Sequence, residues 1–143
     1  MTVWEARNLL YQAGEYFYQR GQYWEAEPLW KSYLAICEQV LGPEHRDTLG
    51  SLNNLALLYW KQGKYEQAEP LYQRALEARE RVLGPEYPDT AQSVDNLANL
   101  YTDQGRYEEA EPLYQRALAT YERVLGADHP ETKRVRNNYA ILL

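Results

Sequence analysis

Four side-chain amides recur at a fixed interval along this chain and are its most regular polar feature. Asn54, Asn96 and Asn138 are 42 residues apart, and Gln12 holds the corresponding position one interval earlier. A carboxamide carries two N–H donors and an acceptor oxygen, so it can pair with the backbone of an extended peptide whatever the peptide's sequence. Two readings stay open: these amides bind a partner, or they bond to neighbouring helices.

The histidines and the cysteine, which are common catalytic residues and metal ligands, have no partner residues at the spacing that catalysis or metal binding needs. His45 and His129 are two intervals apart and Tyr87 holds the matching position between them, so both histidines follow the repeat as loop residues. Cys37 has no histidine near it in the sequence and is expected to be a buried or half-buried, inert thiol. We find no glycine-rich phosphate loop, zinc spacing or nucleophile elbow. The sequence therefore predicts no enzyme activity, no catalytic residue, no metal and no cofactor.

Composition limits the class of protein, its partners and its compartment. The 143 residues are 45% hydrophobic and 25% charged, which is typical of a folded domain. No apolar run approaches the roughly 20 residues of a membrane span, and the first residues lack the pattern of a secretory signal. A net charge of -6 argues against nucleic acid and anionic membranes as partners. The single cysteine favours a reducing compartment, so we expect a cytoplasmic protein.

The interval seen in the amides extends through the whole chain. Leu41–Glu44 returns as Leu83–Glu86, and residues 41–82 match residues 83–124 at 28 of 42 positions. Such self-similarity is typical of stacked repeats that share one continuous core. We expect a single domain over residues 1–143, with repeats at about 5–46, 47–88 and 89–130 and a partial repeat at 131–143.

Each repeat has the pattern of two helices. In the middle repeat, Leu52, Leu55 and Tyr59 have helical spacing, Gly63 interrupts the pattern, and a second apolar stripe begins at Ala68. β-branched residues are few and no segment alternates as a strand would. The predicted helices are near 3–20, 23–41, 47–62, 65–83, 89–104, 107–125 and 131–142.

Helix starts and prolines carry two further expectations. Asp47–Thr48 and Asp89–Thr90 are predicted to cap the helices that follow them. A proline falls inside each predicted second helix, where it removes a backbone hydrogen bond. These helices either start late or bend, and we favour a small bend. The three prolines are Pro28, Pro70 and Pro112.

This pattern resembles the tetratricopeptide repeat (TPR). The first helix of that repeat carries a large apolar residue, then Leu, a small residue and Tyr, and its second helix carries Ala, an aromatic and Ala. The middle repeat matches with Leu52, Leu55, Ala56 and Tyr59, followed by Ala68, Tyr72 and Ala75. The long period is similar to the repeats of kinesin light chain and nephrocystin-3-type proteins. The resemblance implies an all-α solenoid of antiparallel helix pairs, with about seven helices.

The resemblance also implies a function and a binding surface. In this family the first helix of each repeat lines a concave groove that binds partners. We therefore expect a protein–protein interaction module that binds a peptide or partner segment in the groove, as matching asparagines hold cargo peptides in kinesin light chain-like repeats. The candidate groove residues are Tyr11, Gln12, Glu15, Tyr18, Asn53, Asn54, Leu57, Trp60, Lys61, Asp95, Asn96, Asn99, Asp103, Arg134, Asn137 and Asn138.

Aromatic residues gather in the first repeat, which holds 9 of the 19 within its first 33 residues. Tyr18 and Trp60 hold equivalent positions in successive repeats and are candidate anchors for a ligand. The excess indicates either a cap filled with aromatics or a contact surface for a partner or a second copy. The alternatives to peptide binding are thus a self-associating scaffold, a homo-oligomer through this repeat, and a regulatory fragment of a larger multidomain signalling protein.

Basic residues are sparse among the groove positions. Some TPR proteins clamp a C-terminal carboxylate with Lys, Asn and Arg on successive first helices, and the matching positions here hold no such set. We therefore expect no carboxylate clamp. Lys133, Arg134 and Arg136 form a small basic patch, which is either a solvated helix face or a place for an acidic ligand group.

Overall fold

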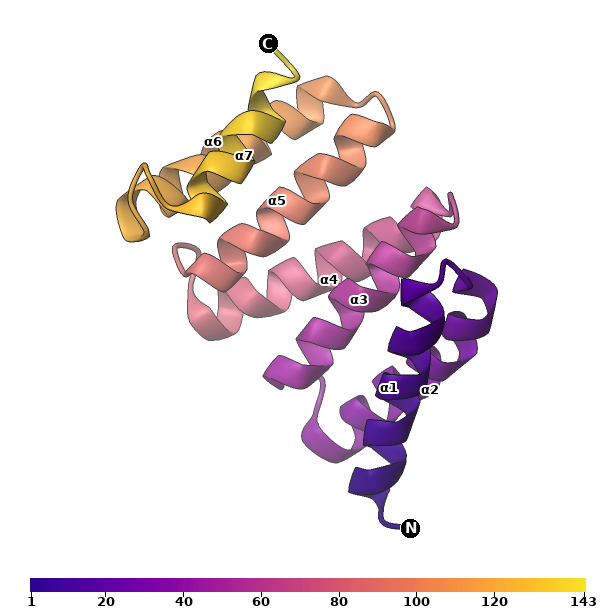
Figure 1. Cartoon of the computed structure of the whole chain (residues 1–143). Coiled ribbons are helices and arrows are strands. Elements are labelled where there is room, and N and C mark those ends of the chain that lie inside the picture. Colours follow the sequence, from indigo (N-terminus) through magenta and orange to yellow (C-terminus); the bar gives the residue numbers. More distant parts are fainter. The chain divides into compact units, whose positions relative to one another are not determined.

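Seven helices and the turns between them make up the protein (Figure 1). The computed structural model describes all 143 residues and contains no strand. The predicted all-α fold is confirmed, and every predicted helix end lies within two residues of the observed one. The helices are α1 (Val3–Gln19), α2 (Tyr23–Leu41), α3 (Arg46–Lys61), α4 (Tyr65–Leu83), α5 (Pro88–Asp103), α6 (Tyr107–Val124) and α7 (Pro130–Ala140).

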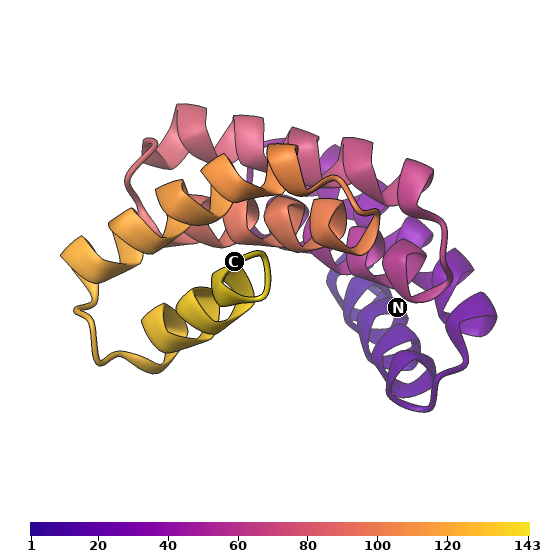
Figure 2. The same cartoon turned by 90° about the horizontal axis from the view of Figure 1, so that it is seen from above.

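The chain forms two compact units, residues 1–71 and 72–143, and the division falls inside α4. In the first unit α2 packs against α1 and α3, and in the second unit α6 packs against α5 and α7. Figure 2 shows α5 and α6 running side by side. Each unit therefore holds two first helices of the repeat pattern, α1 and α3 in one and α5 and α7 in the other. The helices are too short or too polar to span a lipid bilayer.

Glycine reverses the chain between the two helices of each repeat. Gly21, Gly63 and Gly105 have φ between +73° and +76°, a conformation that side chains other than hydrogen disfavour. The following residue then bonds back across the helix end, as when the Lys64 N–H donates to the Tyr59 oxygen at 2.8 Å. This bond closes a Schellman motif, which satisfies carbonyls that the helix end would leave unpaired.

The helix starts differ from the prediction, because Asp47 and Asp89 are not the caps. α3 begins at Arg46 and its cap is His45, whose Nδ1 accepts a hydrogen bond from the Asp47 N–H at 3.1 Å. His129 caps α7 in the same way. Both aspartates lie instead in the first turn, where a carboxylate is favoured by the helix dipole. The two loop histidines thus have a structural role that their sequence positions do not reveal.

The threonines of the predicted caps tie each first helix to the helix before it. Thr48 and Thr90 are fully buried and donate to the carbonyl oxygens of Gly42 and Gly84, each at 2.8 Å. Their hydroxyls are therefore not available to cap the next helix. The prediction is wrong because it weighed residue preference within one helix, whereas the bond is made across the turn.

The prolines lie inside the second helices, which begin well before them. α2, α4 and α6 start at Tyr23, Tyr65 and Tyr107, so the alternative of a late helix start is excluded. Each proline falls in the second turn, where its missing N–H leaves one carbonyl of the first turn without its usual donor.

Small residues let the helices of each unit approach closely. Ala26, Ala56 and Ala98 are completely buried. In the first repeat Gly14 takes the place of the alanine, because the bulkier Trp30 packs there: a Cβ on Gly14 would lie 2.2 Å from Trp30 Nε1. The Trp30 indole N–H donates to the Tyr11 carbonyl oxygen at 3.3 Å, which satisfies its polar atom in the core.

Candidate functional site

The candidate groove residues fall on the four first helices, two in each unit. In the unit of residues 1–71, α1 carries Tyr11, Gln12, Glu15 and Tyr18, and α3 carries Asn53, Asn54, Leu57, Trp60 and Lys61. In the unit of residues 72–143, α5 carries Asp95, Asn96, Asn99 and Asp103, and α7 carries Arg134, Asn137 and Asn138.

The period-related amides form one pair in each unit. Gln12 and Asn54 belong to the first unit, and Asn96 and Asn138 belong to the second. Gln12 is exposed and the three asparagines are half-buried. None of the four side chains makes a hydrogen bond within the protein. Their donors and acceptors are therefore available to another molecule.

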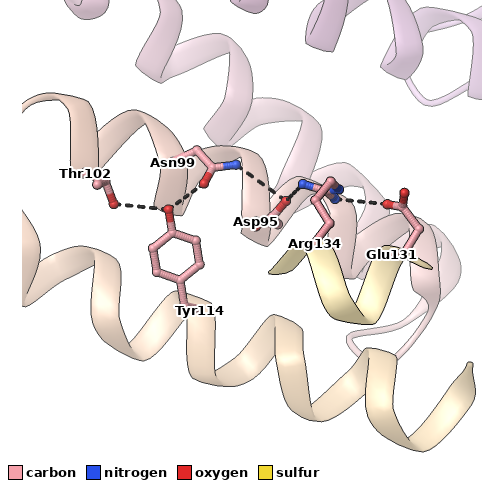
Figure 3. A network of polar contacts seen from close by, with 6 residues as sticks. All are labelled: Asp95, Asn99, Thr102, Tyr114, Glu131 and Arg134. Carbon is pink, nitrogen blue, oxygen red and sulfur yellow. Dashed lines mark hydrogen bonds and ion pairs between the residues drawn. The ribbon is translucent and has the colours of Figure 1, made fainter. Parts of the chain in front are cut away.

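An ion pair joins α5 to α7 in the second unit (Figure 3). Arg134 Nη1 donates to Asp95 Oδ2 at 2.7 Å, and Arg134 Nη2 donates to Glu131 Oε2 at 2.9 Å. The Asp95 side chain is 0% exposed, whereas that of Arg134 is 40% exposed. The second carboxylate oxygen of Asp95 is also buried and has no partner. Asp95 thus positions the guanidinium, and Arg134 is the member of the pair that a ligand can reach.

Burial and charge act in opposite directions on this ion pair. Burial raises the pKa of Asp95, while the charge and hydrogen bond of Arg134 counteract part of that rise. Burial also acts to lower the pKa of Arg134, but the hydrogen bond that Arg134 donates to Glu131 and the charge of Asp95 outweigh burial, so the pKa is raised. Each of the two charges has lost part of its hydration and is stabilised by the opposite charge of its partner.

A chain of hydrogen bonds extends from Asp95 along α5 to α6 (Figure 3). Asn99 Nδ2 donates to Asp95 Oδ2 at 3.5 Å, and Tyr114 donates its hydroxyl proton to Asn99 Oδ1. The Tyr114 hydroxyl also lies 3.1 Å from the Thr102 hydroxyl. The amide of Asn99 is therefore occupied within the protein, unlike those of Asn96 and Asn138.

Aromatic rings from α1 and α2 form a continuous cluster in the first unit. The Tyr11 ring packs 5.3 Å from Tyr33, and Tyr18 packs 5.2 Å from Trp30 and 5.5 Å from Tyr23. Burial and the nearby charge of Glu15 raise the pKa of Tyr11, and burial is also the main cause of the raised pKa of Tyr18. Both phenols stay protonated at neutral pH, so they offer hydrogen-bond donors at the edge of an apolar surface.

A lysine in the turn between α3 and α4 contacts α2 in the first unit. Lys64 Nζ lies 3.1 Å from Glu27 Oε1 and 4.1 Å from the centre of the Trp24 ring. It also lies 5.6 Å from the centre of the Tyr59 ring. Two aromatic faces and a carboxylate therefore surround one ammonium group, so an ion pair and cation–π contacts hold its position.

The basic patch predicted on α7 is largely neutralised. Arg134 pairs with Asp95 and Glu131, and Arg136 lies 3.6 Å from Glu122. Lys133 is exposed. This arrangement favours the reading of a solvated helix face over a site for an acidic ligand.

Several residues of these clusters were not among the sequence candidates. Tyr114, Thr102 and Glu131 complete the network around Asp95, and Trp30 and Tyr33 complete the aromatic cluster. Tyr114 and Trp30 occupy a packing position of the repeat, so the pattern assigns them to the core. One signal was present: Thr102 is a small polar residue where the other repeats have Trp60 and Tyr18, which leaves room for the Tyr114 hydroxyl.

Known proteins share both the repeat and the arrangement of helices. The family model described as tetratricopeptide repeat matches residues 5–81, 47–119 and 89–143. The crystal structure of a Podosopora anserina putative kinesin light chain with nearly identical TPR-like repeats aligns with a TM-score of 0.85. It is 26% identical and covers 94% of this chain and 64% of that chain.

Two further proteins extend this comparison. The structure of BtubC (BKLC) from P. vanneervenii aligns with a TM-score of 0.80 and 27% identity, over 98% of this chain and 61% of that chain. A 47-residue stretch, 33% of this chain, is 45% identical to a nucleotide-binding leucine-rich repeat (NLR)-like protein of Hyaloscypha variabilis and covers 5% of it. The chain thus spans less than two-thirds of the length of each of these relatives.

Proposed function

Because the chain belongs to the tetratricopeptide repeat family, we propose that it binds a peptide or an extended segment of a partner protein along its first helices. Repeats of this family are typically protein–protein interaction modules, and their first helices line a concave surface. The proposed role is binding rather than catalysis. The proposed compartment is the cytoplasm, because the one cysteine, Cys37, is a free and buried thiol.

The observation that carries this proposal is the state of the repeated amides. Asn54, Asn96 and Asn138 keep their carboxamides out of every hydrogen bond within the protein. The alternative reading, in which they bond to neighbouring helices, has no hydrogen bond to support it. A polar group that is half-buried and unpaired gains most from a partner, because part of its hydration is already lost.

Neighbouring side chains supply the means for a partner's sequence to be recognised. In the first unit, Tyr11 and Tyr18 present phenol groups at the edge of the aromatic cluster. Aromatic side chains of this kind are common binding hot spots. We propose that the amides hold the backbone of the bound segment and that the aromatic edge selects an apolar or aromatic side chain.

Peptide selection followed by mutation tests the proposal. A displayed library of random peptides is selected on the full chain, and the dissociation constant of a selected peptide is measured by isothermal titration calorimetry. The variant Gln12→Ala with Asn54→Ala, which removes the two period-related amides of the first unit, is expected to raise that constant by about tenfold or more, since two hydrogen bonds are lost. The thermal midpoint should stay nearly unchanged, because the amides make no internal bond.

Two exposed glutamines on second helices provide a matched control. Gln39→Ala with Gln67→Ala removes the same number of amides from α2 and α4. This variant should bind the peptide as the wild type does. Loss of stability with intact binding in the variant of Gln12 and Asn54 would show that these amides are structural. An equal loss of peptide affinity in both variants would show that the first helices contribute no more to binding than the second helices do.

A further inference from the structure

Two large side chains on one face of α1 are exposed, although their counterparts on α3 and α5 are buried. The residues of this face alternate at spacings of four and three, which keeps them on one side of a helix. Leu9 is 52% exposed and Tyr16 is 53% exposed. The face consists of Thr2, Ala6, Leu9, Ala13, Tyr16 and Arg20.

The repeat shows what normally lies on this face. Leu9 and Tyr16 correspond to Ser51 and Leu58 on α3, which are 3% and 0% exposed. They also correspond to Ser93 and Leu100 on α5, which are completely buried. The face is thus the one on which a neighbouring helix packs in this architecture. At positions 9 and 16, α1 carries larger apolar side chains than its counterparts, and more than half of each side chain stays exposed.

We propose that this face of α1 binds the same face of a second copy of the chain. The two helices run antiparallel, and the two-fold axis crosses the face between Leu9 and Ala13, at the level of residue 11. An interface with this symmetry requires a surface that complements itself. Antiparallel pairing about residue 11 sets Leu9 opposite Ala13 of the second copy and Tyr16 opposite Ala6 of the second copy. Each large side chain therefore meets a small one, as close helix packing requires.

Charge favours the same arrangement. Glu5 lies beside this face in the first turn of α1, and Arg20 ends the face at the helix C-cap. An antiparallel copy brings each of these residues within about one turn of its opposite, whereas a parallel copy sets like charges together. The Arg20 guanidinium lies 4.4 Å from the centre of the Tyr16 ring, so it extends along the face rather than away from it.

The size of the face sets the strength of the contact. A single helix face buries less than the roughly 1,200 Å² at the low end of stable interfaces. The dimer is therefore a reversible one, formed at high protein concentration. A second copy is favoured over an unrelated helix because both the size pairing and the charge pairing are satisfied by α1 itself.

Charge reversal provides a test that only a two-fold interface passes. Sedimentation velocity of the full chain, from about 10 μM to about 1 mM, is expected to show a monomer–dimer equilibrium. Glu5→Arg alone, and Arg20→Glu alone, should each raise the dimer dissociation constant by about tenfold or more, because every pair then carries like charges. An equimolar mixture of the two variants should recover the dimer, since both pairs become opposite in the heterodimer.

Control variants keep the result interpretable. Lys133→Glu makes the same change of net charge as Arg20→Glu at an exposed position on α7 and should leave the equilibrium unchanged. Glu5 lies next to the Thr2 cap of α1, so helicity is checked by circular dichroism, and Leu9→Gln provides a disruption that leaves the helix end intact. A wild-type chain that stays monomeric to about 1 mM overturns the proposal. A dimer that survives Leu9→Gln, or a mixture that fails to recover, overturns it as well.

Discussion

Replacing Arg134 with methionine should destabilise the protein through the carboxylate that it leaves behind. Asp95 is 0% exposed and its remaining oxygen has no partner, so loss of the 2.7 Å ion pair strands a buried charge. Breaking a fully buried pair costs about 3–5 kcal/mol. Arg134 is 40% exposed, so water can reach the vacated position and we expect about 2 kcal/mol. For a chain of this length that corresponds to a fall of about 7 °C in the thermal midpoint.

The loss should depend on pH in a defined direction. Burial raises the pKa of Asp95 in the folded protein above its ordinary value of 3.8. A raised folded-state pKa gives stability that is fully present below the unfolded value and is lost as the pH rises through the folded value. Removing Arg134 raises the folded-state pKa of Asp95 further. The stability deficit of Arg134→Met is therefore largest at neutral pH and shrinks as the pH is lowered toward the ordinary aspartate range.

Urea unfolding of the wild type and the Arg134→Met variant at pH 7 and at pH 4.5 measures both effects. Adding Asp95→Asn to Arg134→Met removes the stranded charge and should recover a large part of the loss at pH 7. Asp95→Asn alone serves as the fourth corner of a double-mutant cycle. A deficit of equal size at the two pH values, or no recovery in the double variant, would refute the assignment of the loss to a buried carboxylate.

Two further substitutions test the packing and the electrostatics of the first unit. Gly14→Ala should destabilise the protein by about 1–3 kcal/mol, because the new methyl group would lie 2.2 Å from Trp30. Gly50→Ala has open space around it and should stabilise α3 by about 0.5–1 kcal/mol. Similar thermal midpoints for the two variants would contradict this prediction. Burial acts to raise the pKa of Glu27, but the hydrogen bond from Lys64 and other partners lower it below 4.5, so its stabilising effect is present above pH 4.5 and is lost as the pH falls further. Lys64→Met should therefore lower the free energy of unfolding by about 1 kcal/mol at pH 7 and by less at pH 3, as measured in urea titrations. Lys31→Met changes a more exposed lysine that also contacts Glu27, and it should lower this free energy by less. A loss of stability in Lys64→Met that does not change with pH would contradict the assignment to Glu27.

The helices and turns could be predicted from the sequence because their signals are local. Helical spacing of apolar residues marks each helix, and Gly63 marks the turn at which the backbone must adopt positive φ. The caps could not be predicted in the same way. Thr48 is drawn to the Gly42 carbonyl across the turn, and His45 takes over the cap, so the outcome depends on where the previous helix ends.

For the candidate site, the sequence identified positions but not their states. The period predicts that Asn54, Asn96 and Asn99 lie on first helices, and the structure distinguishes between them. Asn99 is bonded to Asp95 and Tyr114, whereas Asn54 and Asn96 make no bond within the protein. That difference follows from which side chains the neighbouring helices bring within about 3 Å, a distance that no single-chain periodicity contains.

By itself, the sequence determined the repeat: a 42-residue period fixes which residues are equivalent, and amphipathic spacing fixes which side of each helix is apolar. Only the tertiary structure decided which of the equivalent residues are buried, exposed or paired. Asp95 is buried because α7 brings Arg134 over it, and Leu9 is exposed although its counterpart Ser51 on α3 is buried. The physical reason is that burial and pairing are properties of contacts between helices, whereas propensity and period are properties of each helix alone.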